Sequence, residues 1–329
     1  MINLNQIGTM VTERQSSVVQ STKMGALMLF TLGLSLITTN AEAGSLAGAE
    51  SFTGKINYTV TGGTLRSNPD SIDACSLNSS STAFLAALPD GATVKKAYLY
   101  WAGSGENIDD QITFDDTSLT ADKTYTSSMM INDNEYYHFQ GVKDVTNLIA
   151  QKGNGSYSFG GLTVDNTNDN ANYCSFRVVL SGWSLVVIYD DPTLDSNKIN
   201  TIKLYEGLET SRNQTVNYTL NGIEVATDPI AKFSMLLWEG DLSLGGANES
   251  FAFNGNTLSD AYNPLENQFN SSINTNEALE VYGVDFDTFD VSSYVTQGDT
   301  SVTGTISTGD DLVLQGAALM MVTTIYTPD

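Results

Sequence analysis

The sequence predicts an all-β protein built of two packed β-sandwich, jelly-roll-like units with one disulfide. Hydrophobic residues make up 41% of the chain and charged residues only 16%, while Gly, Ser, Thr and Asn are plentiful. This composition disfavours long helices and suits strands joined by turns. Short segments with a strand pattern recur between turn residues along the whole chain, which is typical of sandwiches and jelly rolls.

Two segments with apolar residues on both faces predict central strands. Val94–Trp101 follows the turn signal Pro89-Asp90-Gly91, and Trp183–Tyr189 ends at Asp190-Asp191-Pro192. A strand that is apolar on both faces must be covered on both sides. We therefore expect both segments in the core.

Weaker strand patterns surround these two, and Asp144–Ile149 is the best short-helix candidate. The weaker strands are predicted at Gln111–Phe114, Tyr136–Phe139, Ser156–Phe159, Phe176–Leu180, Ile199–Tyr205, Thr215–Leu220, Lys232–Trp238, Ser250–Phe253, Leu279–Val284, Ser301–Ile306 and Leu312–Tyr326.

The segment Lys55–Thr61 alternates cleanly, with Ile56, Tyr58 and Val60 on one side. It predicts a half-buried strand. Glycines on both sides tether it loosely, so it could pair within its own domain or act as a donor strand for a neighbouring subunit. Donation would produce filaments.

A division between the two sandwiches is predicted after Leu208, where the wholly polar run Glu209–Gln214 begins. The domains are then 44–208 and 209–329. Each half contains a similar element before a glycine-containing turn, Asp144-Val145-Thr146-Asn147-Leu148 and Asp290-Val291-Ser292-Ser293-Tyr294. This suggests that the two sandwiches are related.

Residues 1–43 read as a secretory signal peptide. Arg14 and Lys23 precede the uncharged apolar run Met24–Thr38, and small residues at Ala41 and Ala43 fit a cleavage site. The run is too short to span a bilayer. We therefore expect an exported protein, extracellular or at the cell surface, with no membrane span in its mature form.

The chain contains two cysteines, Cys75 and Cys174. In an exported protein an even pair is most simply one disulfide. Neither cysteine lies in a Cys-x-x-Cys pattern and His138 is the only histidine, so a metal or redox role has no support in the sequence.

The net charge of −24 makes nucleic acid and anionic lipid improbable partners and favours divalent cations. Calcium is the cofactor that the sequence supports best, because it takes several oxygen ligands from acidic loops. The alternative is that these residues form turns and caps. The candidate ligands are Asp165 and Asp169 in one loop, Asp285, Asp287 and Asp290 in a second, and Glu239 and Asp241 in a third.

Enzyme functions find little support. His138 is the sole candidate base for a serine triad, and neither a Gly-x-Ser-x-Gly elbow nor a phosphate-binding glycine loop occurs. A glycoside hydrolase needs two carboxylates, which the sequence cannot exclude. Tyr98, Tyr100 and Trp238 could instead form a flat sugar-binding platform, although core packing explains them more simply.

A series of short sequence motifs resembles the N-terminal, non-catalytic β-sandwich region of bacterial cell-surface and adhesin-like proteins that carry Ig-like repeat domains. The motifs are Ala97-Tyr98-Leu99-Tyr100-Trp101-Ala102-Gly103, Asp144-Val145-Thr146, Gly153-Asn154-Gly155-Ser156-Tyr157, Gly182–Tyr189, Glu239-Gly240-Asp241, Phe269-Asn270-Ser271-Ser272 and Val284–Val291. The resemblance implies a surface location and a sandwich fold, and it carries no catalytic motif.

Together these features predict a secreted, non-catalytic structural or adhesive protein of the cell surface or extracellular matrix. Its partners would be copies of itself, other surface or matrix components, or glycans. The alternatives are a carbohydrate-binding module and, less favoured, a two-carboxylate glycoside hydrolase.

Overall fold

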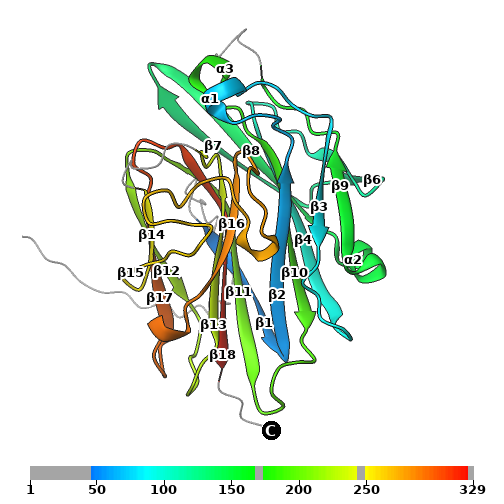
Figure 1. Cartoon of the computed structure of the whole chain (residues 1–329), viewed down its shortest axis with the longest axis vertical. Helices are drawn as coiled ribbons and strands as arrows, with labels where there is room; N and C mark the ends of the chain where they lie inside the picture. The colour runs from blue at the N-terminus through cyan, green and yellow to red at the C-terminus, as the bar shows by residue number, and fades with distance from the viewer. Residues whose placement is uncertain (1–45, 167–172, 243–248, 325–329) are drawn as a thin grey trace, which may run out of the picture. The chain divides into compact units, whose positions relative to one another are not determined.

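A computed structural model describes residues 46–166, 173–242 and 249–324, which belong to one compact unit. Four antiparallel sheets account for most of this part of the chain (Figure 1). In the first half the strands are β1 (Ala47–Gly54), β2 (Ile56–Thr64), β3 (Ser80–Leu85), β4 (Thr93–Ser104), β5 (Gln111–Phe114), β6 (Thr117–Thr120), β7 (Lys123–Ile131), β8 (Asn134–Asp144), β9 (Gly155–Gly160) and β10 (Ser181–Asp190).

The second half continues with β11 (Ile199–Ser211), β12 (Thr215–Asn221), β13 (Ala231–Trp238), β14 (Ser250–Phe253), β15 (Asn256–Thr257), β16 (Val284–Asp290), β17 (Ser301–Ser307) and β18 (Val313–Thr324). The short helices of the described residues are α1 (Asp70–Asp73), α2 (Thr146–Lys152), α3 (Tyr173–Phe176), η1 (Asn274–Asn276) and η2 (Ser292–Tyr294). None of them is long and apolar enough to cross a membrane.

The sheets form two sandwiches. The first pairs an inner sheet, ordered β2-β10-β4-β8-β7, with an outer sheet, β3-β9-β5-β6. The second pairs an inner sheet, β1-β11-β18-β13-β16, with an outer sheet, β12-β17-β14-β15. In Figure 1 the outer strands β3, β6 and β9 lie to one side of the inner sheets, and β12, β14, β15 and β17 lie to the other. The predicted all-β sandwich fold is confirmed.

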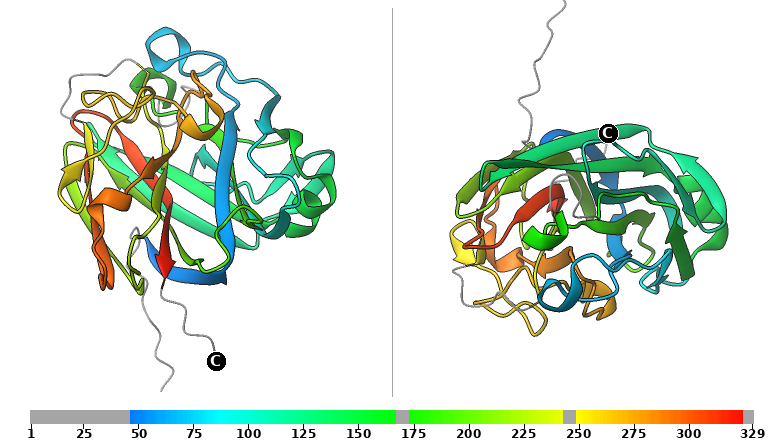
Figure 2. Two further views of the ribbon diagram at one scale, coloured as in Figure 1. Left: turned by 60° about the horizontal axis from the view of Figure 1, so that its bottom comes forward. Right: turned by 90° about the horizontal axis from the view of Figure 1, so that it is seen from above.

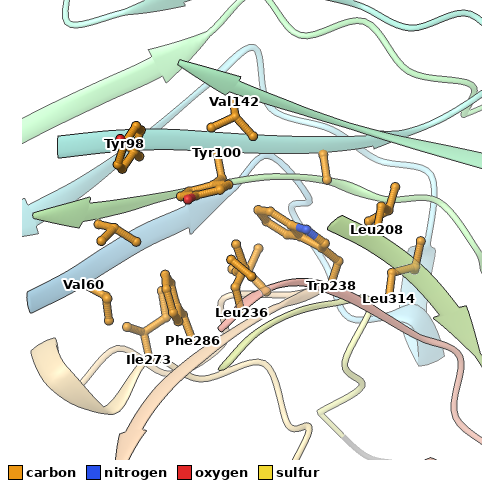
Figure 3. Close-up of a cluster of buried hydrophobic side chains, with 14 of the residues drawn as sticks. Val60, Tyr98, Tyr100, Val142, Leu208, Leu236, Trp238, Ile273, Phe286 and Leu314 are labelled. Carbon is orange, nitrogen blue, oxygen red and sulfur yellow. The ribbon is translucent and has the colours of Figure 1, made fainter. Parts of the chain in front are cut away.

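Three apolar cores lie between these four layers. The central core lies between the two inner sheets, and each sandwich has its own core between its inner and outer sheets. Alternate residues of one strand serve different cores: Tyr100 of β4 belongs to the central core, whereas Trp101 belongs to the core of the first sandwich. Figure 3 shows Tyr98, Tyr100 and Val142 facing Leu236, Trp238 and Phe286 across the central core.

The two sandwiches have the same topology. In chain order β2, β3, β4, β5, β6, β8, β9 and β10 occupy the positions that β11, β12, β13, β14, β15, β16, β17 and β18 occupy in the second sandwich. Among the strands of the described residues, only β1 and β7 have no counterpart.

The elements Asp144-Val145 and Asp290-Val291 make equivalent hydrogen bonds in the two sandwiches. The Val145 amide donates to the Ala97 carbonyl, and the Val291 amide to the Ala231 carbonyl, both at 2.9 Å. Asp144 and Asp290 each accept the amide of the residue two positions later, again both at 2.9 Å. The similarity between these two elements in sequence therefore reflects a structural repeat.

The strands change from one sandwich to the other between β10 and β11, that is, between Asp190 and Ile199. The position predicted for the division, Leu208, lies inside β11. The polar run Glu209–Gln214 forms the end of β11 and the turn into β12, which belong to the same sandwich. The N-terminal strand β1 also joins the second sandwich, because it pairs with β11.

Two predicted strands are wrong in place or type. Phe176–Leu180 is not a strand: the helix α3 ends at Phe176, and Arg177 has a φ of 58°, which no strand residue adopts. Leu279–Val284 is irregular because Glu280 and Gly283 also have positive φ, and the strand begins only at Val284. The sequence prediction also missed β1, β3, β6, β7, β15 and most of β16.

The predicted donor strand is β2, and it lies within the sheet of its own chain. It pairs with β10 from Ile56 to Thr64, and Ile56, Tyr58 and Val60 are buried in the central core. Its outer edge is covered by side chains of the second sandwich. Asn200 Nδ2 donates to the Ile56 carbonyl at 2.8 Å, Lys232 Nζ to that of Tyr58 at 3.5 Å and Thr275 Oγ1 to that of Val60 at 2.8 Å.

The predicted disulfide Cys75–Cys174 is present, with Cα atoms 5.4 Å apart. Cys75 follows α1 and Cys174 lies in α3. These two helices lie at the same end of the molecule, the upper end in Figure 1, which Figure 2 (right) shows from above. The disulfide therefore joins the β2–β3 connection to the segment that leads into β10.

Candidate functional site

Buried acidic residues gather where β13 and β16 approach the end that carries α1 and α3. Glu239 follows β13 directly, in a left-handed conformation with φ 73°, and Asp241 comes two residues later. Asp285 and Asp287 lie on β16, whose register with β13 places Asp285 opposite Leu237. Six residues make up this acidic cluster: Glu239, Asp241, Glu249, Asp285, Asp287 and Asp311.

Part of the cluster lines a cavity of about 190 Å³ to which both sandwiches contribute, and we call it the junction pocket. A wider depression that contains Cys75 and Cys174 adjoins it and shares Asp70 and Arg177 with it. The charged residues that line the junction pocket are Asp70, Glu239, Asp241, Asp310, Asp311, Arg177 and Arg212.

Three carboxyl groups that line the pocket, those of Glu239, Asp241 and Asp311, resist ionisation. Burial raises the pKa of Glu239 to about 8, against the opposing effect of Arg66. Burial also raises the pKa of Asp241, and it raises that of Asp311 well above the usual value, with further contributions from the other acidic residues of the cluster. Glu239 and Asp311 are each only 2% exposed. Glu239 Oε1 and Asp311 Oδ2 are buried without a hydrogen-bond partner.

The other three acidic residues lie against the segment that precedes β16. Glu249 accepts the Phe269 amide at 3.4 Å, Asp285 accepts that of Ser272 at 3.2 Å and Asp287 accepts that of Asn274 at 2.9 Å. Burial raises the pKa of Glu249 to about 8 and that of Asp287 to about 7. The pKa of Asp285 lies well above its usual range, because burial and the nearby charge of Asp287 act together.

Arg66 is the cation buried next to this group. It follows β2 and forms ion pairs with Asp70 and, at 3.5 Å, with Glu239 Oε2. Since Arg66 comes from the first sandwich and Glu239 from the second, this contact joins the two sandwiches. A single guanidinium leaves most of the acidic residues without a positive partner.

Gly240 allows this close approach. A Cβ atom at this position would lie 1.9 Å from Asp285 Oδ2 and 2.8 Å from the Phe269 carbonyl oxygen. No side chain can be accommodated there without moving the carboxylate or the backbone. The spacing Glu239-Gly240-Asp241 thus lets Asp285 pack directly against the chain.

The structure brings together two of the three predicted calcium loops. Glu239, Asp241, Asp285 and Asp287 belong to the acidic cluster, whereas Asp290 lies at the exposed end of β16 and accepts the Ser292 amide. Asp165 is exposed and lines a different depression, with Asp109. Asp169 lies outside the described residues. Among the residues described, no three His, Cys, Asp or Glu side chains are placed to ligate one metal ion directly.

The other side chains considered for function are structural. His138 is fully buried, its Nε2 lies 3.0 Å from the Val178 carbonyl, and burial lowers its pKa to about 4. Tyr98, Tyr100 and Trp238 are all buried, so core packing, the simpler of the two explanations for these aromatics, is confirmed and they form no exposed sugar-binding platform. Tyr100 donates to Glu206 and Trp238 to Gln140, so even their polar atoms are used inside the protein.

Sequence reasoning missed Arg66, Glu249 and Asp311. Arg66 and Asp311 lie far from Glu239 along the chain, Glu249 follows it by ten residues, and none of the three lies in a recognisable motif. An acidic residue after a Gly-Asp turn, such as Asp311, resembles an ordinary turn former. Only the packing of the two sandwiches shows that these residues share one site.

The fold and the site thus define a two-repeat β-sandwich protein with an acidic pocket at the junction of its repeats. The chain belongs to the family described as "Protein of unknown function (DUF3344)", which matches residues 42–323. No curated protein matches it.

Among solved structures, the chain has weak similarity to BpGH86A, a β-porphyranase of glycoside hydrolase family 86 from the human gut bacterium Bacteroides plebeius. The identity is 13% and the TM-score 0.27, over 76% of this chain and 35% of that one. BuGH86 in complex with neoagarooctaose gives 12% identity and a TM-score of 0.24, over 71% and 33% of the two chains. The chain thus spans about a third of the length of these enzymes, and TM-scores this low do not establish a shared fold.

Proposed function

We propose that this protein is an exported, non-catalytic structural or adhesive component of the cell surface or extracellular matrix. The observation that carries the proposal is the disulfide Cys75–Cys174. Disulfides persist in oxidising environments outside the cytoplasm. The signal peptide predicted from the sequence of residues 1–43 agrees with this location, and the resemblance to adhesin-like proteins stays a prediction.

The packing of the two sandwiches supports a structural role. The inner sheets are buried on both faces, and ion pairs and hydrogen bonds cross the junction between the sandwiches. Such a block presents a fixed surface to a partner. With a net charge of −24, that surface suits neutral or cationic partners such as matrix components and glycans rather than nucleic acid.

Export is tested by expressing residues 1–329 in a bacterium and separating the cytoplasmic, membrane and external fractions. We expect the mature chain outside the cytoplasm, beginning at Gly44, with both cysteines inaccessible to thiol reagents until a reductant is added. A cytoplasmic protein with two free thiols would contradict the proposal.

Assembly is tested by negative-stain electron microscopy of residues 44–329. Since β2 is paired with β10 and its outer edge is covered, we do not propose it as a connector between subunits. We expect discrete particles. Long regular fibres would show that strand exchange occurs despite this pairing.

A glycan-directed activity is the second candidate, and the pocket carboxyl groups are the observation that favours it. Glycosidases use a carboxylic acid with a raised pKa beside a second carboxylate. Glu239 and Asp241 both line the junction pocket, and burial raises the pKa of each. Release of reducing sugar from a panel of algal and bacterial polysaccharides, abolished in Glu239→Gln, would establish this candidate in place of the first.

A further inference from the structure

The junction pocket is lined by more acidic side chains than basic ones. Five of the residues that line it are acidic and two are arginines. Arg177 is exposed and Arg212 is half-buried, and the Arg212 Nε already donates to the Asp310 carbonyl at 2.8 Å. Arg66 is paired with Asp70 and Glu239. Among the described residues, the ion pairs of these arginines thus reach Asp70 and Glu239 but not Asp241, Asp310 or Asp311.

Two acidic side chains that line the pocket each have one carboxyl oxygen without a hydrogen-bond partner, which is a separate observation from the number of acidic residues. Glu239 and Asp311 are each 98% buried, and each has one carboxyl oxygen without a hydrogen-bond partner. Burying an unpaired polar oxygen costs free energy, and burying an unpaired charge costs more. A bound ligand that offers positive charge to both oxygens would remove this cost.

The size of the pocket limits what that ligand can be. A cavity of about 190 Å³ accommodates a metal ion together with several water molecules, since one water takes up about 30 Å³. The described residues do not place three acidic side chains around one point, so the ion must keep part of its water shell. Hard divalent cations bind carboxylate oxygens and commonly retain water ligands.

We propose that the junction pocket binds one partly hydrated divalent cation, which Glu239 and Asp311 hold from the inside while water completes its coordination shell. Asp241, which lines the same pocket, adds negative charge that attracts the ion. Because the pocket is lined from both sandwiches, the ion would also strengthen the junction between them. This proposal does not depend on the protein being a surface component.

The direct test counts metal ions on the unaltered mature protein. Residues 44–329 are treated with chelator and then dialysed to equilibrium against 1 mM CaCl₂ or 1 mM MgCl₂ at pH 7.5, with NaCl at equal ionic strength as the control. Mass spectrometry of the metal content should show one bound equivalent with at least one of the two salts. Absence of binding with both salts would overturn the proposal, and a difference between the salts identifies the ion.

Variants then locate the ion. Glu239→Gln and Asp311→Asn keep the shape of the side chain and should each weaken cation binding at least about tenfold, whereas the exposed Asp116→Asn is the matched control and should not. A saturating cation should raise the melting temperature of the unaltered protein by about 5 °C.

Undiminished binding by both pocket variants would place the ion elsewhere and overturn the assignment. If either variant fails to fold, Asp241→Asn and the metal count on the unaltered protein still decide the question.

Discussion

At the scale of single residues, Glu239 shows how burial can outweigh an ion pair. Arg66 lies 3.5 Å from its carboxylate and favours ionisation, yet burial raises the pKa to about 8. Loss of hydration is thus the larger effect at this position. The same holds for Glu249, whose pKa is also about 8 although it accepts a backbone hydrogen bond.

This arrangement predicts that stability falls as the pH rises. The folded-state pKa of Glu239 lies above the ordinary value of 4.5, so its contribution is complete below about pH 4.5 and is lost as the pH rises toward 8. In chelator, unfolding by urea should show a clear loss of stability from pH 6.5 to 9. Glu239→Gln cannot ionise and should reduce that loss by about 2 kcal/mol. An equal slope in this variant and in the exposed control Asp116→Asn would contradict the assignment.

His138 gives the opposite case, a base that burial keeps neutral. Its pKa is lowered to about 4, so its contribution to stability is present above the ordinary value of 6.5 and is lost as the pH falls toward 4. Because the chain has one histidine, proton NMR of the imidazole ring reports on this residue alone. We expect its resonances to stay unchanged down to about pH 5. A midpoint near 6.5 would show that the ring is exposed.

At the scale of elements, the edge of β2 is the most informative feature. Edge strands offer unpaired backbone groups to other chains, and proteins commonly cover them. Here three successive outward carbonyls, those of Ile56, Tyr58 and Val60, accept hydrogen bonds from side chains of the second sandwich. The counterpart of β2 in the second sandwich, β11, is covered differently, by the strand β1.

We predict that Thr275→Val destabilises this edge and promotes association. The substitution keeps the shape of the side chain but removes the hydroxyl that donates to the Val60 carbonyl at 2.8 Å. It should cost about 1 kcal/mol in urea unfolding and increase the oligomeric fraction in size-exclusion chromatography with light scattering. Thr275→Ser keeps the hydroxyl and should behave as the unaltered protein. If Thr275→Val and Thr275→Ser behaved identically, the hydrogen bond from Thr275 to the Val60 carbonyl would not stabilise this edge.

At the scale of the whole molecule, two sandwiches of the same topology share one central core. Each inner sheet has one face in that core, where Leu236 and Trp238 of one sandwich meet Tyr100 and Val186 of the other. The two repeats are therefore joined by apolar burial and not by a flexible linker. Contact across the junction is also polar, through Arg66 and Glu239.

The disulfide contributes to the stability of the whole molecule because it closes a loop with a sequence separation of 99 residues. Replacing both cysteines, Cys75→Ser with Cys174→Ser, should reduce the free energy of unfolding by about 2 to 4 kcal/mol. Dithiothreitol should lower the stability of the unaltered protein to the same value and leave the double variant unchanged. If reductant destabilised both proteins equally, the effect would not come from this bond.

The sequence alone was sufficient for the fold class, the disulfide and the two principal strands. Val94–Trp101 and Trp183–Tyr189 are apolar on both faces, and a strand with that pattern must lie between two layers. Cys75 and Cys174 are the only possible pair. The similar sequences of the Asp144 and Asp290 elements, each before a glycine-containing turn, already suggested the repeat. In the structure both elements follow a strand and open a short helical turn.

Tertiary structure alone decided where the sandwiches meet and which acidic residues share a site. Glu239 was singled out from its own loop, but Arg66, Glu249 and Asp311 join it only because the sheets pack together. Likewise, the pattern of Ile56, Tyr58 and Val60 identifies a strand but not its partner, because pairing depends on residues far away in the chain. Local periodicity records which face of an element is buried, and contacts between distant segments determine what that face is buried against.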